Sequence, residues 1–410
     1  MRSPKIRFKG YSEDWEQRKL GELADKVTEK NGRLQYIETF TNSAEFGIIS
    51  QRDFFDHDIA KIGSLDGYYI VRNEDFVYNP RISTSAPVGP INRNKLGRIG
   101  VMSPLYTVFR PHDVDTTYLE HFFKSKYWHS FMNYNGDSGA RSDRFSIKDS
   151  VFFEMPIPIP QIEEQRKIGE HLTQLDLLIT LHQRKCEQTQ KLKKYMLQKM
   201  FPQDKTNVPK IRFDGFTDAW EQRKLGEITE LKSASRVHKD EWTSNGVPFY
   251  RSSDVMAAIN GTENEKAFIS EELYEKLSKV SGKLEEGDIL VTGGGSVGNP
   301  YIVPDNKPLY TKDADLLWIK NKGKFHPYFL YDFFFSPTFR NYLGSISHVG
   351  TIAHYTITQL SETPICLPSF EEQKEVGEYF QSLDHLITLH QQKCDQLQSI
   401  KKYMLQNMFV

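Results

Sequence analysis

The strongest constraint on this chain is that its sequence is written twice. Trp15–Gly21 reads WEQRKLG, and Trp220–Gly226 reads the same. The longer match around these motifs starts at Pro4 and again at Pro209, an offset of 205 residues (209 − 4). A repeat of this length indicates two copies of one architecture rather than one continuous core.

A second pair of matching blocks closes each half. Glu163 opens the run EEQRKIGE and Glu371 opens EEQKEVGE, at an offset of 208 residues (371 − 163), and the motifs LITLH and KKYML follow in both. Between the matched blocks, residues 25–150 and 230–360 share little sequence. Near-identical borders around divergent middles indicate that the borders do one job twice, while the two middles do different jobs.

The closing blocks predict two long helices. Residues 163–201 and 371–409 contain no proline, and their apolar positions recur at alternating steps of four and three. At 1.5 Å per residue each helix would extend roughly 55–60 Å, far more than one core requires. We therefore expect the two helices to pair with each other. The positions expected to form this pairing are Leu172, Leu175, Ile179, Cys186, Phe380, Leu383, Ile387 and Cys394.

The middles predict mixed α and β structure. Runs rich in β-branched and aromatic residues indicate strands at 46–49, 67–71, 105–109, 247–250, 288–292 and 316–319, and helices are expected near 117–132 and 327–343. Proline-rich approaches at 155–160 and 363–368 lead into the long helices. The predicted order is a first domain at 1–160, a helix at 161–201, a linker at 202–208, a second domain at 209–368 and a helix at 369–410.

The predicted fold class is therefore α+β: two similar mixed α/β domains alternate with two long helices.

Composition indicates a cytoplasmic, reduced protein that does not span a membrane. The formal net charge is −1, hydrophobic residues make up 38% and charged residues 26%, and no apolar run is long enough to cross a bilayer. The first eight residues lack the apolar stretch of a secretory signal. The near-neutral charge argues against indiscriminate nucleic-acid binding, but a local basic surface would suffice for DNA.

No motif predicts catalysis, nucleotide binding or a metal site. Tyr78–Arg81 reads YNPR, which lacks the second proline and final aromatic of the methyltransferase tetrapeptide. Gly293–Ser296 lacks the Gly-Lys-Ser/Thr ending of a nucleotide-binding loop, so we interpret it as a turn or a DNA-backbone contact. Cys186 and Cys394 lie at equivalent positions of the two predicted long helices, near His182 and His390. We expect these cysteines to pack as small apolar residues rather than to bind zinc or form a disulfide.

The layout resembles the specificity subunit of type I restriction-modification systems. The duplicated WEQRKLG motifs, the proline-rich approaches and the helix openings at Glu163 and Glu371 carry this resemblance over essentially the whole chain. In that family each variable domain reads one half of a split DNA site. The resemblance therefore implies that the two helices pair as an antiparallel coiled coil with pseudo-two-fold symmetry. This spacer sets the gap, and two methyltransferase subunits dock around it.

The resemblance also implies where the chemistry occurs. A chain of this kind is not itself an enzyme and holds no cofactor. S-adenosylmethionine is expected in the methyltransferase partner, and ATP and Mg in the restriction subunits of the full complex. The expected partners are double-stranded DNA with a bipartite site, two methyltransferase subunits and restriction subunits.

Basic, hydroxyl and aromatic residues in the loops of the middles are the candidate DNA readers. Arg suits guanine edges, and small polar or glycine residues suit close backbone contact. The candidates in the first domain are Arg81, Ser83, Ser85, Arg93, Lys95, Arg98, Arg141 and Arg144. Those in the second are Arg251, Ser252, Gly294, Ser296, Lys312, His348, Thr351, His354 and Tyr355.

Two functions from other classes compete with DNA reading. A nuclease or methyltransferase would require a carboxylate cluster or cofactor loop that this sequence does not provide. A non-catalytic coiled-coil adaptor without DNA readout is the stronger alternative. Two related middles with unrelated loops argue against an adaptor, because an adaptor has no need for them.

Overall fold

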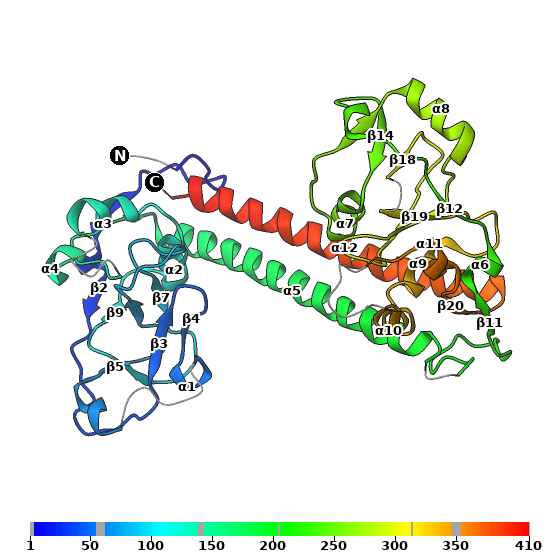
Figure 1. Ribbon diagram of the computed structural model, residues 1–410. Coiled ribbons are helices and arrows are strands. Elements are labelled where there is room, and N and C mark those ends of the chain that lie inside the picture. The colour runs from blue at the N-terminus through cyan, green and yellow to red at the C-terminus, as the bar shows by residue number, and fades with distance from the viewer. Residues whose placement is uncertain are drawn as a thin grey trace. The chain divides into compact units, whose positions relative to one another are not determined.

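The computed structural model describes residues 4–54, 62–137, 143–203, 206–312, 315–346 and 354–409. The chain divides into two units. Unit 1 comprises Met1–Gln183 and Gln392–Val410, and unit 2 comprises Arg184–Gln391. Helix α5 (Ile162–Met200) and helix α12 (Phe370–Asn407) are therefore each shared by both units. Figure 1 shows these two predicted long helices, whose existence is confirmed.

Unit 1 is built around a four-stranded sheet in the order β2-β9-β6-β7, with three two-stranded pairs, β1-β10, β3-β4 and β5-β8. Its strands are β1 (Glu16–Lys19), β2 (Ala24–Lys26), β3 (Phe40–Ser43), β4 (Gly47–Ser50), β5 (Tyr69–Val71), β6 (Phe76–Tyr78), β7 (Ile91–Arg93), β8 (Gly100–Met102), β9 (Thr107–Pro111) and β10 (Pro156–Ile159). Its shorter helices are α1 (Gln51–Phe54), α2 (Thr116–Lys124), α3 (His129–Asn135) and α4 (Asp149–Phe152), with 3₁₀ turns at Leu20–Glu22 and Ile62–Gly67.

Unit 2 repeats the main sheet in the equivalent order β12-β19-β16-β17, and adds the sheet β13-β15-β14-β18 and the pair β11-β20. Its strands are β11 (Glu221–Lys224), β12 (Leu231–Ser233), β13 (Trp242–Thr243), β14 (Val247–Tyr250), β15 (Ala267–Ile269), β16 (Ile289–Thr292), β17 (Pro300–Ile302), β18 (Tyr310–Thr311), β19 (Leu316–Ile319) and β20 (Pro364–Leu367). Its shorter helices are α6 (Leu225–Ile228), α7 (Ser252–Asn260), α8 (Glu271–Ser281), α9 (Pro327–Phe333), α10 (Pro337–Ile346) and α11 (Ile357–Ser361), with a 3₁₀ turn at Lys239–Glu241.

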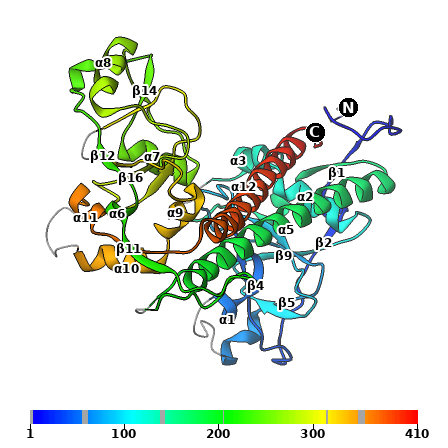
Figure 2. The same cartoon turned by 90° about the vertical axis from the view of Figure 1, so that its right-hand side faces the viewer.

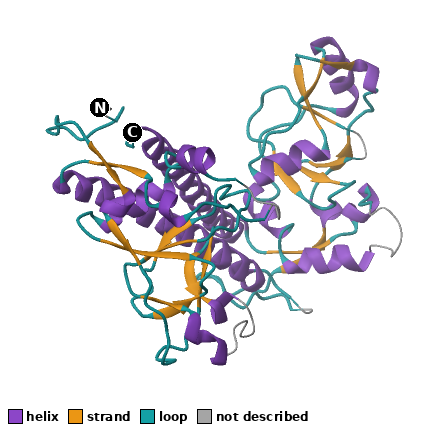
Figure 3. Ribbon diagram, turned by 90° about the vertical axis from the view of Figure 1, so that its left-hand side faces the viewer, coloured by secondary structure: helices purple, strands orange, loops and turns teal. Residues whose placement is uncertain are grey.

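The figures show how these elements are distributed within each unit. Figure 2 shows α8 beside β14 and α7 beside β16, which agrees with the burial of Tyr274 against β14 and of Val255 against β16. Figure 3 shows the strands as short arrows joined by extensive loops. All six predicted strands are confirmed within a few residues by β4, β5, β9, β14, β16 and β19.

The two shorter helices predicted at 117–132 and 327–343 are each broken in two. In unit 1, the Ser125 hydroxyl donates to the Phe122 carbonyl at 2.6 Å and the Trp128 indole donates to the Phe123 carbonyl at 3.0 Å. These side chains satisfy carbonyls that a continuing helix would use, so α2 ends at Lys124. In unit 2 the break lies before Pro337, because proline disfavours helical geometry in the residue that precedes it. Pro337 then begins α10.

The duplicated residues make the same contacts in each unit. Arg7 forms a two-point ion pair with the buried Glu164 at 2.8 Å, and Arg212 forms the equivalent pair with the buried Glu372 at 2.6 and 2.7 Å. The WEQRKLG motif supplies a strand in both copies, with β1 antiparallel to β10 and β11 antiparallel to β20. The repeated borders thus dock each domain onto the start of a long helix.

Glycine is required where each domain meets its helix. A Cβ at Gly169 of α5 would lie 3.0 Å from the Tyr118 backbone nitrogen, and one at Gly377 of α12 would lie 2.9 Å from the Phe329 nitrogen. Both glycines let a helix of the domain approach closely, α2 in unit 1 and α9 in unit 2. The glycine that the two EEQ blocks share therefore has a steric cause.

In each unit the two long helices run side by side and antiparallel. In unit 2, Lys193 of α5 bonds Asp384 of α12 at 2.6 Å, and Cys186 lies 3.9 Å from the Ile387 carbonyl and the Gln391 amide oxygen. Numbering falls on one helix as it rises on the other. In unit 1, Lys401 of α12 bonds Asp176 of α5, the matching pair of the repeat. The predicted α+β class with two antiparallel long helices is confirmed.

The positions predicted for helix pairing occupy the interiors of the units. The buried ones are Leu172, Leu175, Ile179, Cys186, Phe380, Leu383 and Cys394, whereas Ile387 is partly exposed. Lys193 and Lys401 were not predicted to form ion pairs. In each unit one lysine-aspartate pair takes the place of an apolar contact between the two long helices.

The Lys193 cluster contains one more carboxylate than it can neutralise. Asp332 of α9 is fully buried and lies 3.1 Å from the Lys193 Nζ, which also serves Asp384. Burial raises the pKa of Asp332 to about 7; Lys193 opposes this increase, and Asp384 adds to it. Native Asp332 therefore keeps its proton at pH values at which an unfolded aspartate, with its usual pKa of 3.8, has lost it.

We expect Asp332→Asn to gain stability relative to the wild type as the pH rises from about 4 to about 7. In that window the unfolded wild-type chain releases a proton that the native chain holds, so wild-type stability falls by up to about 1.4 kcal/mol per pH unit. Above the native pKa the difference should be constant. Melting temperatures measured across this range test it, with the exposed Asp240→Asn as control. Parallel pH profiles for Asp332→Asn and wild type would contradict the assignment.

Candidate nucleic-acid interface

The two units build a loop cluster at the same point of their main sheets. In unit 1 the end of β6 lies beside the start of β9, with Tyr78 opposite Thr107. In unit 2 the end of β16 lies beside the start of β19, with Thr292 opposite Leu316. The loops that leave these strand ends carry the predicted readers Arg81, Ser83 and Ser85 in unit 1 and Gly294, Ser296 and Lys312 in unit 2.

The same backbone hydrogen bond closes both clusters. In unit 1 the Phe145 amide donates to the Pro80 carbonyl at 2.7 Å, and in unit 2 the Tyr355 amide donates to the Gly293 carbonyl at 2.8 Å. Each bond ties the segment before a short helix, α4 or α11, to the loop that follows the central strand. Equivalent backbones thus present different side chains in the two units.

In unit 1 this arrangement places two arginines directly opposite each other. Arg81 and Arg144 form an isolated antiparallel bridge, and both are exposed. Among the described residues, no carboxylate pairs with either guanidinium group. Like charges directly opposite on neighbouring strands destabilise a fold, so this pair is costly unless an anion neutralises it.

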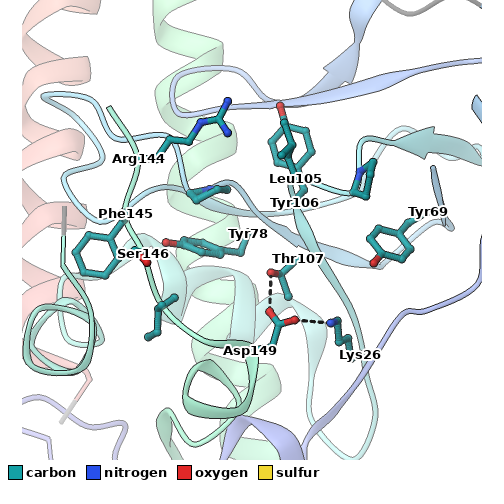
Figure 4. A pocket seen from close by; sticks show the side chains of 13 residues that line it. Lys26, Tyr69, Tyr78, Leu105, Tyr106, Thr107, Arg144, Phe145, Ser146 and Asp149 are labelled. Atoms are coloured by element: carbon teal, nitrogen blue, oxygen red, sulfur yellow. Dashed lines mark hydrogen bonds and ion pairs between the residues drawn. The ribbon is translucent and has the colours of Figure 1, made fainter. Parts of the chain in front are cut away.

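A hollow of about 460 Å³ opens beside Arg144. Figure 4 shows Arg144 on one side of Tyr78 and the Asp149 side chain on the other. Asp149 accepts hydrogen bonds from Thr107 at 3.3 Å and from Lys26. The lining residues are Lys26, Tyr69, Tyr78, Pro80, Pro104, Leu105, Tyr106, Thr107, Arg144, Phe145, Ser146, Ile147 and Asp149.

Charge and rigidity are both built into this hollow. The hydrogen bond to Asp149 raises the pKa of Lys26, which therefore stays cationic. The Tyr78 hydroxyl donates to the Val88 carbonyl at 3.0 Å, and its ring stacks on Phe152 at a centroid distance of 5.0 Å. Tyr78 is thus a fixed wall, whereas Leu105 is 59% exposed at the tip of the turn before β9.

The other candidates of unit 1 are divided between surface and interior. Ser83 and Ser85 are exposed, and their hydroxyls lie 3.1 Å apart in the loop after Arg81. Lys95 is exposed but bonds Glu120 at 3.2 Å, and Arg98 makes a bidentate pair with Glu38 at 2.8–3.0 Å. Lys95 and Arg98 therefore already have partners within the chain.

The prediction that Arg93 reads DNA is not supported. Its side chain is 9% exposed and pairs with Glu74 at 3.1 Å and Glu120 at 2.7 Å. Burial opposes ionisation of Glu120, but Lys124 and Arg93 together lower its pKa to about 2. Arg93 therefore connects β7 to α2 and is an internal structural residue.

In unit 2 the structure brings Ser252, Gly294, Lys312 and His354 together around Asp315. Ser252 donates to the Asp315 carbonyl at 3.0 Å, and Lys312 pairs with its carboxylate at 2.6 Å. A Cβ at Gly294 would lie 3.5 Å from that carboxylate and 4.0 Å from His354 Nδ1. This cluster combines a carboxylate, an ammonium group and an imidazole, whereas the equivalent place in unit 1 presents two arginines.

The remaining predictions in unit 2 have mixed outcomes. The prediction that Tyr355 contacts DNA is not supported, because Tyr355 is 1% exposed, packs on Phe339 and bonds the Thr363 hydroxyl, and so belongs to the core. Arg251 is held by Asp254 at 2.9 Å and lies over the Trp242 ring. Ser296 is exposed, and its carbonyl accepts from Asn299 at 2.7 Å. Arg141, His348 and Thr351 lie outside the described residues.

Sequence reasoning missed Lys26, Tyr69, Tyr106, Asp149 and Asp315. Lys26 and Asp149 are 123 positions apart and meet only through the sheet order, so no local pattern joins them. Asp315 directly precedes a predicted strand, and its position at that strand end was an available signal.

Among the described residues no group of three or more His, Cys, Asp or Glu side chains is placed to hold a metal ion. No described helix is long and apolar enough to span a bilayer.

Comparison with known families agrees with the duplicated architecture. The family model for the type I restriction modification DNA specificity domain matches residues 12–191 and again residues 217–399. The chain belongs to this family. Each match covers one copy of the repeat, including a loop cluster and most of a long helix.

Individual relatives of this specificity family match nearly the whole chain. The type I restriction enzyme MjaVIII specificity subunit of Methanocaldococcus jannaschii is 24% identical over 405 residues, covering 96% of this chain and 91% of the relative. A putative type I restriction enzyme specificity subunit, S.HindORF215P of Haemophilus influenzae, is 23% identical over 365 residues, covering 87% and 80%.

Solved structures share the fold. The S subunit of a type I restriction-modification system from M. genitalium superposes with a TM-score of 0.59 at 15% identity, covering 100% of this chain and 99% of that one. A second chain, from a structural study of type I R-M complex assembly and conformational transition, gives a TM-score of 0.50 at 15% identity, covering 96% of each.

The unneutralised arginine pair predicts a stabilising substitution. Arg81→Glu should raise the melting temperature of the isolated chain, because it converts the repulsion with Arg144 into a cross-strand attraction of about 0.2–1 kcal/mol. The matched control is Arg72→Glu, which removes an existing ion pair with Glu29 and should lower stability. A lower melting temperature for Arg81→Glu would show that the two guanidinium groups do not repel each other.

Proposed function

We propose that this chain selects the DNA target of a type I restriction-modification complex. Unit 1 reads one half of a bipartite site and unit 2 reads the other, and the long helices set the unread gap and dock two methyltransferase subunits. The observation that carries the proposal is the exposed Arg81–Arg144 pair beside a hollow at the strand ends of unit 1.

Duplex DNA supplies what this pair lacks. Phosphates neutralise closely spaced cations, and a guanidinium also makes two hydrogen bonds to the O6 and N7 of guanine in the major groove. The pair lies on loops attached to a sheet, where a rigid scaffold positions mobile side chains for contact. Repulsion between the arginines in the free chain would be relieved on binding, which increases the preference for the bound state.

The cluster in unit 2 has a different chemistry and supports a different half-site. Asp315 offers a carboxylate acceptor, which suits the N4 amino group of cytosine, while Lys312 and His354 offer donors to bases or phosphates. Two equivalent backbones with different polar groups are suited to two unlike base sequences. A coiled-coil adaptor would have no use for this difference, and the family assignment does not support that alternative.

The exposed faces of the long helices support docking of the same partner twice. In unit 1, Leu178 and Leu181 of α5 and Ile400 and Tyr403 of α12 are 38–59% exposed. In unit 2 the equivalent positions of the repeat are Leu386 and Leu389 of α12 with Leu192 and Tyr195 of α5, exposed by 41–50%. Large apolar side chains at helical spacing on a surface indicate a protein contact.

We assign the chemistry of the complex to its other subunits. The methyl donor S-adenosylmethionine would bind the methyltransferase partner, and ATP and Mg the restriction partner. The specificity chain would contribute target selection and geometry. The cytoplasm, where DNA and these partners meet, is the corresponding location.

Arg144→Ala should weaken recognition of the first half-site only. If the guanidinium reads a base, modification of the target should lose about 1–3 kcal/mol of preference at that half-site. Sequence preference in the second half should not change. Methylation mapping in cells that express the complete system, with wild-type and variant chains, measures both halves together. The control is Arg72→Ala, which removes a partly exposed arginine that pairs with Glu29 outside the loop cluster. A uniform loss over all sequences would reassign Arg144 to a phosphate contact.

Partner docking should fail one copy at a time. The wild-type chain should bind two methyltransferase subunits in native mass spectrometry. Leu178→Glu with Leu181→Glu should leave one bound copy, and Leu386→Glu with Leu389→Glu should also leave one, because each pair places charge in one apolar face. Val280→Glu, at a residue 78% exposed on α8, should retain both copies. A single bound copy for the wild type would contradict the arrangement.

A further inference from the structure

The hollow beside Arg144 has walls that differ from those of an ordinary surface groove. Tyr69, Tyr78 and Tyr106 contribute aromatic rings, and Pro80 and Pro104 contribute flat aliphatic rings. Its volume of about 460 Å³ falls within the range of roughly 300–1,000 Å³ that is typical of small-ligand pockets. The space is therefore large enough for a planar group to enter.

Polar groups lie within the same hollow. Asp149 presents a carboxylate held by Thr107 and Lys26, so acceptor and donor atoms stand next to each other. A few polar groups at fixed positions are enough to orient a ligand. A heterocycle with both amino and carbonyl groups at its edge would match this donor and acceptor set.

The rim of the hollow is cationic. Arg144 lines it, and Arg81 is the bridge partner of Arg144. The occupant should therefore carry a flat ring attached to an anion. Within a DNA strand, a nucleotide has both parts in this arrangement.

We propose that the hollow of unit 1 receives one nucleobase that leaves the DNA stack, while Arg81, the bridge partner of Arg144, holds the adjoining phosphate. The proposal rests on the proposed function and specifies how the first half-site is read. Aromatic walls favour any unstacked base, and the Asp149 and Lys26 pair would select among bases by their edges.

The test uses the chain assembled with its methyltransferase subunits and a series of duplexes containing the mapped site. In each duplex one base pair of the first half-site is weakened by an abasic residue in one strand, opposite an intact base, and both strands are scanned. At the position whose intact base enters the hollow, weakening the pair should tighten binding about tenfold, because the base is released at lower cost. At stacked positions the same change should weaken binding or leave it unchanged.

Two variants locate the occupied pocket. Leu105→Trp places a large ring at the hollow and should abolish the gain. Ile37→Trp is the matched control, because Ile37 is 58% exposed in the same unit and does not line the hollow, and it should keep the gain. Circular dichroism confirms that both variants fold.

The remaining outcomes are distinguishable. A gain at the base that the methyltransferase itself flips should persist in both variants. The proposal is overturned if no position shows a gain that Leu105→Trp abolishes and Ile37→Trp keeps. If the complex prefers its mapped site to scrambled DNA but shows no gain, only the pocket assignment fails. If it shows no preference for its site, the proposed function fails as well.

Discussion

Lysines within an apolar seam determine which residues of the two long helices face each other. Lys193 contacts Asp384 in unit 2, and Lys401 contacts Asp176 in unit 1. Both lysines are mostly buried, at 15% and 18% side-chain exposure, so a broken pair would leave a poorly solvated charge without its partner. A shifted register would break both pairs. The positions of the domains on their helices, and hence of the loop clusters, depend on this register within each unit.

The sequence predicted the parts of the structure that repeat along the chain. Long proline-free runs with steps of four and three became α5 and α12, and β-rich runs became strands. The breaks after α2 and after α9 were missed because they depend on side chains such as Ser125, whose hydroxyl competes for a helix carbonyl, and on the onset at Pro337. These signals are local and were present in the sequence, but the spacing of apolar residues, on which the helix prediction rested, does not register them.

The candidate site was only partly predictable for a related reason. Arg81 and Arg144 were selected for their charge, but their pairing across a bridge follows from the strand order and was not visible in the sequence. Tyr355 was selected as an aromatic loop residue, yet its equivalent position in unit 1 is Phe145, which is also buried. An aligned comparison of the two halves at that backbone hydrogen bond would have identified both as anchors. The adjacent residues, Arg144 and His354, are exposed and free to differ.

The partition of the chain has a consequence for its synthesis. The Ile6 amide bonds the Asn407 carbonyl, and the core of unit 1 includes Leu397, Met408 and Phe409. Unit 2 comprises Arg184–Gln391 and is complete in sequence before any of these residues is made. On a ribosome the second unit can therefore fold first. The core of the first unit stays incomplete until the residues after Gln391 have been synthesised. A truncated product would lose the stability of the domain that was translated first.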